Sequence, residues 1–126
     1  MGTRACYVFY ETADEQNGHV IFKHYDGYPK GAVVALAAGR DKTFPLPRYE
    51  ASAAAAGFIA ANHDGGADTR VFGYGDWKQL ISGDTRYVYL VRPDHAGNVI
   101  VTGVNVETEA EHFREPLASI ERAKIQ

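Results

Sequence analysis

The clearest pattern along the chain is a pair of apolar segments joined by a polar turn. Residues 5–10 and 19–25 are rich in β-branched and aromatic side chains, which are typical of strands. The dipeptide Asn17-Gly18 between them is the strongest short signal for a tight hairpin turn. These two segments and the turn between them therefore predict an antiparallel hairpin. Because apolar residues occupy both faces of its first strand, we expect that strand to be covered on both sides.

A second hairpin is expected towards the C-terminal end. Residues 85–92 and 99–106 are again rich in β-branched and aromatic residues, and the polar loop 93–98 joins them. Residues 70–74 have the same character over a shorter length and predict one further strand. The chain thus has strands at both ends and a different composition in the middle.

Alanine-rich segments in the middle of the chain predict helices. Residues 30–38 form a short helix that Gly39 is expected to close, with a loop at 40–46. Residues 47–62 form a second helix, which begins at Pro47 and has strong intrinsic helix propensity. Their small side chains would let both helices lie close to neighbouring backbone.

Two shorter helices are expected later in the chain. Asp76 is suited to cap a helix over residues 77–81, because its carboxylate accepts from the first free N–H groups. Pro116 marks the expected start of a C-terminal helix, in which Leu117 and Ile120 would face the core. Phe113 would pack onto that helix from before its cap.

The order of elements predicts an α+β fold. We expect a mostly antiparallel sheet built from two β-hairpins, with helices between and after them packed on one face. A chain of 126 residues has the usual length of one domain, so we assign residues 1–126 to a single domain.

Composition narrows the classes of function. The net charge of −3 and the absence of Lys and Arg clusters argue against direct nucleic-acid binding. No segment is long and apolar enough for a signal peptide or a membrane span. The single cysteine, Cys6, excludes a disulfide within the chain and fits a reducing compartment. We therefore expect a cytoplasmic protein that needs no cofactor.

Ionisable and aromatic side chains are most concentrated at residues 23–29, between the second strand and the first helix. The candidate binding residues there are Lys23, His24, Tyr25, Asp26 and Tyr28, with Arg4 as a further candidate. The tyrosines would offer rigid contact area, and the ionisable side chains would fix a ligand's orientation. A structural interpretation explains much of the same segment, because Asp-Gly favours a turn and Pro29 favours a helix start. Both interpretations stay open at this stage.

Other reactive residues give weaker signals. His63-Asp64 is the nearest approach to a metal-binding pair, but structural zinc needs four clustered ligands. Cys6 lies within a predicted strand, where a cysteine is usually a small buried hydrophobe, although His24 on the neighbouring strand would be its nearest base. The glycines of residues 73–76 precede a helix and would present N–H groups to an anion. We expect no metal site and no catalytic residue, and we leave the question of enzyme activity open with a preference against it.

Residues 23–29, together with Thr3, Arg4 and Gly31, resemble a motif of small phage and prophage proteins. Those proteins begin with Gly-Thr-Arg and carry a strand that ends in His-Trp/Tyr-Asp-Gly-Tyr-Pro, followed by a glycine and a helix. Tyr87-Val88-Tyr89 is similar to their later Tyr-x-Tyr strand. The resemblance covers about the first 36 residues and the 85–92 segment, and leaves residues 40–83 without a counterpart.

The resemblance implies a setting rather than a reaction: an accessory protein of a phage or mobile element, acting in the bacterial cytoplasm. Proteins of this kind often bind host machinery. The leading hypothesis is therefore a binding protein that engages a host protein and inhibits a defence system, as an anti-CRISPR protein does. The alternative is a binding protein or hydrolase for a small molecule or nucleotide signal, which would use residues 23–29 with His24 as its acid or base. A self-assembling virion component is a third hypothesis.

Overall fold

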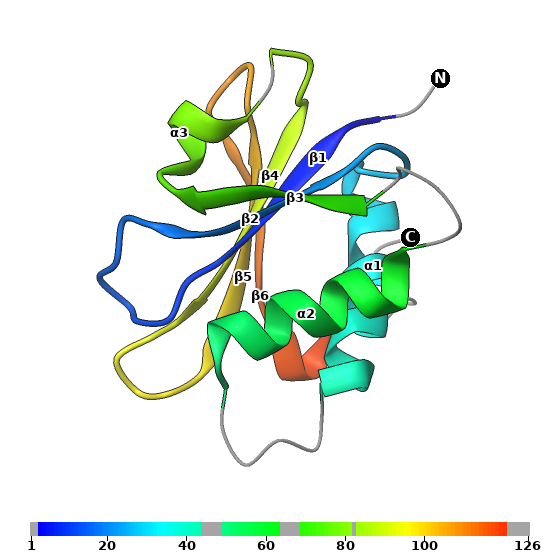
Figure 1. Cartoon of the computed structure of the whole chain (residues 1–126). Coiled ribbons are helices and arrows are strands. Elements are labelled where there is room, and N and C mark those ends of the chain that lie inside the picture. The colour runs from blue at the N-terminus through cyan, green and yellow to red at the C-terminus, as the bar shows by residue number, and fades with distance from the viewer. Residues whose placement is uncertain (1–2, 44–48, 64–68, 82, 121–126) are drawn as a thin grey trace.

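The computed structural model describes residues 3–43, 49–63, 69–81 and 83–120, and it has one six-stranded sheet with helices on both faces (Figure 1). The strands are β1 (Ala5–Phe9), β2 (Gly18–Lys23), β3 (Thr69–Gly75), β4 (Tyr87–Pro93), β5 (Val99–Asn105) and β6 (Glu111–Pro116). The helices are α1 (Pro29–Thr43), α2 (Ala51–Asn62), the single turn α3 (Trp77–Leu80) and the 3₁₀ helix η1 (Leu117–Ser119).

The strand order is β3-β2-β1-β4-β5-β6. Both predicted hairpins, β1–β2 and β4–β5, are present and antiparallel. They meet at the centre of the sheet, where β1 and β4 run parallel and Ala5 pairs with Tyr87. The α+β class with a mostly antiparallel sheet is confirmed, and the single parallel pair makes the sheet a mixed one.

The two long helices cover one face of the sheet (Figure 1). Tyr7, Phe9 and Ile21 point to that face and pack with Leu36 of α1 and Phe58 of α2 in the main core. The ring centroids of Tyr7 and Phe58 are 4.4 Å apart. Burial of these large apolar side chains is what stabilises the helical layer on the sheet.

The other face of the sheet has a smaller core. Cys6, Val8 and Phe22 pack there with half-buried Trp77 and Leu80 of α3. The side chain of Asp76 accepts a hydrogen bond from the Lys78 N–H at 3.0 Å, so the predicted cap of this helix is confirmed. This second core explains why both faces of β1 are apolar.

Gly39 does not close α1, contrary to the expectation from sequence. The helix continues to Thr43, and Gly39 lies where α1 crosses α2. A Cβ atom built on Gly39 would be only 2.9 Å from the Cα of Phe58. The glycine is therefore needed for close helix packing rather than for a helix end. Pro47, the predicted start of the second helix, lies outside the described residues. Tyr49 and Glu50 are described and are not helical, so α2 begins at Ala51, later than predicted, with Glu50 as its N-cap residue.

The C-terminal helix expected from Pro116 is also wrong. Residues 111–116 form β6, because β5 offers an open edge and Phe113 packs over Gly103, where a Cβ would meet the Phe113 ring at 2.7 Å. Of the described residues after Pro116, 117–120, the three of η1 are helical, and the rest of the predicted helix, 121–126, lies outside the described residues. Leu117 and Ile120 are buried, as expected.

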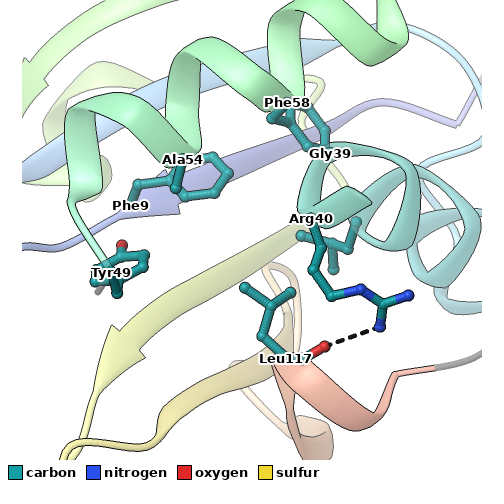
Figure 2. Close-up of a pocket in the computed structure, with 8 residues that line it drawn as sticks. Phe9, Gly39, Arg40, Tyr49, Ala54, Phe58 and Leu117 are labelled. Carbon is teal, nitrogen blue, oxygen red and sulfur yellow. Dashed lines mark hydrogen bonds between the residues drawn. The ribbon is translucent and has the colours of Figure 1, made fainter. Parts of the chain in front are cut away.

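Arg40 joins the end of α1 to this C-terminal segment. Its guanidinium donates to the carbonyl oxygens of Leu117 at 3.1 Å and Ile120 at 2.6 Å. Figure 2 shows Arg40 and Leu117 beside a small cavity of about 20 Å³ that Phe9, Phe58 and other apolar side chains line. Its size and apolar lining indicate a packing defect of the core, since a bound water would need two or more polar partners.

Candidate functional site

The backbone of the 23–29 turn is fixed to the sheet through Gly27. Its N–H donates to the carbonyl oxygen of Thr3 at 2.8 Å, and its carbonyl oxygen accepts from the Tyr89 hydroxyl at 2.5 Å. Burial raises the pKa of Tyr89, so this hydroxyl keeps its proton and remains a donor. The turn is therefore a rigid part of the fold, as the structural interpretation of the motif predicts.

The step from this turn into α1 requires a second glycine. Asp26 has a positive φ of 59° and brings its carbonyl against Gly31. A Cβ atom on Gly31 would approach that oxygen to a distance that no side chain tolerates. Pro29 begins the helix, as the sequence predicts. Asp26, Gly27, Pro29 and Gly31 thus have architectural roles that do not depend on a ligand.

A recess of about 360 Å³ opens to solvent beside the turn. Three predicted binding residues, Lys23, Asp26 and Tyr28, line it. The remaining lining comes from the two long helices: Lys30, Gly31, Val34 and Ala35 of α1, and Asn62 of α2. The end of β2, the start of α1 and the end of α2 therefore form one site.

Lys23 is the unusual member of this set. Its side chain is on the last residue of β2 and only 7% of the residue is exposed, although lysine is rarely buried. Its ammonium donates to the carbonyl oxygen of Tyr25 at 3.0 Å. At the rim, the Tyr28 hydroxyl donates to Asp26 Oδ1 at 3.4 Å. Both polar contacts organise the recess before any ligand is present.

The other three predicted residues lie outside the lining of the recess. Arg4 pairs with Asp84 at 3.1 Å, near the start of β4. The His24 ring packs edge-on against Tyr25, with ring centroids 4.5 Å apart, and against Phe22 at 6.1 Å. Tyr25 is 51% exposed and extends this aromatic group into solvent. The six predicted residues are thus divided between the recess and a neighbouring aromatic surface.

Sequence reasoning missed five contributors to the recess: Lys30, Gly31, Val34, Ala35 and Asn62. Helical periodicity would have placed Lys30 and Val34 on one face, since they are four residues apart. Asn62 gave no such signal, because its place depends on how α2 packs against α1. Its amide donates to the carbonyl oxygens of Ala35 at 3.1 Å and Phe58 at 2.8 Å, which ties the end of α2 to α1.

Cys6 is unsuited to nucleophilic catalysis. It is fully buried and pairs in register with Phe22 rather than with His24. Burial raises the pKa of its thiol to about 12, an effect that the Asp84 charge increases and a hydrogen bond with Thr85 opposes. A cysteine nucleophile needs a lowered pKa and access to solvent.

We expect the Cys6 thiol to be inert towards 5,5′-dithiobis(2-nitrobenzoate) at pH 8 in the native protein. Because the folded-state pKa lies above the ordinary value near 9.0, the thiol stays protonated as well as buried. In 6 M guanidinium chloride the same thiol should react within minutes. Absorbance of the released thiolate measures both rates, and rapid reaction of the native protein would contradict the buried placement.

No other catalytic or metal constellation emerges from residues 3–43, 49–63, 69–81 and 83–120. Within these ranges no group of three His, Cys, Asp or Glu side chains would hold a metal ion. Gly73 and Gly75, considered as an anion-binding turn, belong to strand β3, and the helix after them has only four residues. The pair His63-Asp64 is only half described: the ring of His63 lies 3.3 Å from the carbonyl oxygen of Thr69, and Asp64 is outside the described residues.

Comparisons of the chain with protein-family models, curated proteins and solved structures give no match. The described helices include none with the length and apolar character needed to cross a bilayer.

Proposed function

We propose that this chain is a binding protein that engages a partner protein through the surface around the 23–31 turn. The observation that carries the proposal is a pair of tyrosines on a rigid backbone: Tyr25 is 51% exposed and Tyr28 is 42% exposed. They stand beside a recess that contains both lysine and aspartate side chains. This combination of aromatic contact area and fixed polar groups is typical of interaction hot spots.

Rigidity strengthens the argument for recognition. Gly27 and Gly31 fix the backbone, and the contact with His24 restrains Tyr25. Binding through side chains that are already ordered loses less conformational entropy, and so gains affinity. Tyrosine also has few rotatable bonds for its contact area.

The resemblance to phage and prophage proteins supports the biological part of the proposal. In this setting the chain is an accessory protein of a phage or mobile element in the bacterial cytoplasm. Its partner is a protein of the host, and inhibition of a defence complex is the effect that such binding would have.

The test is capture of partners from a bacterial lysate on immobilised protein, with wild type and two variants compared. We expect a stoichiometric partner to bind wild type and Tyr74→Ala, because Tyr74, although more exposed at 59%, lies on β3 and not at the turn. The double variant Tyr25→Ala/Tyr28→Ala should bind it at least about 30-fold more weakly, which corresponds to the loss of one hot spot of about 2 kcal/mol. Absence of a stoichiometric partner, or equal loss with Tyr74→Ala, would refute the proposal.

A second candidate function is binding of a small molecule or nucleotide signal in the recess. Its volume of about 360 Å³ favours this candidate, since ligand pockets commonly measure about 300–1,000 Å³. The hydrolase version of the hypothesis gains no such support, because His24 is not among the residues that line the recess. A thermal-shift screen with nucleotides tests binding, and no rise in melting temperature at excess ligand would contradict it.

A further inference from the structure

We infer that strand β3 is the contact between two copies of this chain, which pair β3 against β3 in antiparallel register about a two-fold axis at Val71. The two six-stranded sheets then continue into each other. This pairing is independent of the proposed function, because neither Tyr25 nor Tyr28 takes part in it. Three observations support it: the exposure of the β3 edge, the difference between the two edges of the sheet, and the order of the side chains along β3.

Strand β3 forms one edge of the sheet, and no described strand pairs with its outer side (Figure 1). An edge strand directs the backbone N–H and C=O groups of alternate residues away from the sheet, so it is a template for another strand. Val71 is 61% exposed and Tyr74 is 59% exposed, the two highest values among the large apolar side chains of the described residues. The β3 edge thus combines outward-facing backbone groups with exposed apolar surface.

The opposite edge, β6, is protected against such pairing. Residues 111–116 contain three charged side chains and end in a proline. Charged residues and proline on an edge strand oppose the addition of a further strand. Residues 69–75 of β3, in contrast, include one charged residue and no proline. Pairing through β3 therefore closes after two copies, with a protected β6 at each end of the joined sheet.

The side chains of residues 70–72 alternate between the two faces of the sheet. Arg70 and Phe72 lie on the face of the second core, where the guanidinium carbon of Arg70 is 5.0 Å from the centroid of the Phe22 ring and 5.8 Å from that of Phe72. Val71 pairs with Ile21 and lies on the face that α1 and α2 cover. The strand therefore presents a cation and an aromatic ring on one face, with a valine between them on the other.

Antiparallel pairing centred on Val71 makes this order complementary to itself. Val71 then lies opposite Val71 of the second copy, and Arg70 lies opposite Phe72 of the second copy on the same face. Each guanidinium would contact aromatic rings of both copies, an arrangement that favours cation–π attraction. Pairing centred on Phe72 would instead set Arg70 opposite Tyr74, which lies on the other face beside His19. The side chains thus select the register about Val71.

A β-bulge limits how far this pairing extends. The register of β2 with β3 shifts between Val20 and Ile21, so Phe72 is the extra residue of the bulge. Bulges twist an edge and shorten the segment that another strand can follow. The β3–β3 pairing needs residues 69–73 and ends at Gly73, which has a φ of 145°. A ladder of this length indicates a weak dimer whose population depends on concentration, rather than an obligate one.

The experiment measures the mass of the purified protein by light scattering, from micromolar to millimolar concentration. We expect the mean mass to rise from 13.8 kDa towards twice that value and no further. Val71→Lys should raise the dissociation constant of the dimer about tenfold or more, because it sets two ammonium groups opposite each other across the axis. Val34→Lys changes an exposed valine on α1 and should leave that constant unchanged.

A cysteine variant tests the register. Val71→Cys should be cross-linked to a second copy by a short bismaleimide, because directly opposed side chains have Cβ atoms only about 4.5–5.5 Å apart. Val34→Cys should stay monomeric under the same treatment. The native Cys6 is buried and does not compete for the reagent. Circular dichroism of each variant, compared with wild type, shows whether the fold is retained.

Four results would overturn the inference. One is a wild-type protein that remains monomeric at millimolar concentration, and a second is equal dissociation constants for wild type and Val71→Lys. A third is efficient cross-linking of Val34→Cys and none of Val71→Cys. The fourth is growth beyond the dimer, which would contradict the closed pairing. None of these results affects the capture of a protein partner through Tyr25 and Tyr28.

Discussion

Replacement of Phe58 by alanine should lower the free energy of unfolding by about 3–5 kcal/mol, the usual cost of removing a buried phenyl ring. Phe58 is 1% exposed and contacts the rings of Tyr7 at 4.4 Å and Phe9 at 5.7 Å between ring centroids. It also faces Gly39 at the crossing of α1 and α2. Because backbone lies on both sides of the space that the removed ring would leave, that cavity would not collapse easily. Urea unfolding followed by circular dichroism measures the change.

The matched control is Phe72→Ala. Phe72 is half-buried on the edge strand β3, where its ring stacks on Phe22 at 4.7 Å. Removal of the Phe72 ring should lower the free energy of unfolding by less than half as much as removal of the Phe58 ring, because solvent can fill the space. Equal costs for the two phenylalanines would contradict the assignment of the main core to the side of α1 and α2.

Replacement of Gly27 by valine should destabilise the fold by about 3 kcal/mol, the upper part of the range for overpacked sites. A Cβ atom at this position would be 2.6 Å from both the Ala5 Cβ and the Thr3 carbonyl oxygen. One neighbour is the methyl group of a buried alanine and the other is a backbone oxygen, and neither can rotate away. The turn would have to leave the sheet, and the hydrogen bonds with Thr3 and Tyr89 would be lost.

The control for Gly27→Val is Gly83→Val, because a Cβ built on Gly83 has no atom of another described residue within 4 Å, its chain neighbours aside. That substitution should change stability by less than about 0.5 kcal/mol. Urea midpoints measure both effects, and amide spectra would report whether the Gly27 variant displaces residues 23–31. A stable Gly27 variant with an unchanged recess would show that the anchor on the sheet is not needed.

Local signals were sufficient for much of the fold. The β-branched and aromatic residues of 5–10 and 19–25 predicted the first hairpin, and Asp76 predicted its own capping bond, because these elements depend on neighbours in sequence. Asn17-Gly18 does not form the expected tight turn, since Gly18 already belongs to β2 and residues 10–17 join the two strands. The motif at 23–29 also led to three of the eight described residues that line the recess. Lys23, Asp26 and Tyr28 line it, since one turn brings them together.

Tertiary contacts decided the features that sequence reasoning missed. Gly39 has the usual signature of a helix end, yet the approach of Phe58 explains it. Residues 111–116 have no strong strand pattern, and the free edge of β5 makes them a strand. Asn62 entered the recess only because α2 packs against α1. None of these contacts leaves a periodic signal in a single sequence.

The parallel pairing of β1 with β4 also limits how the sheet can form while the chain is being synthesised. In the folded sheet Ala5 pairs with Tyr87, so β1 cannot form its parallel pairing until β4 has been synthesised, long after β1 itself. At about 5–20 residues per second, β1 lacks its central partner for on the order of ten seconds during translation. During that time β1 can pair only with β2, and the helices α1 and α2 are available to cover the apolar face of that hairpin. The nascent chain thus has an interval in which one edge of its most apolar strand is open to chaperones, or to a neighbouring chain on the same messenger RNA.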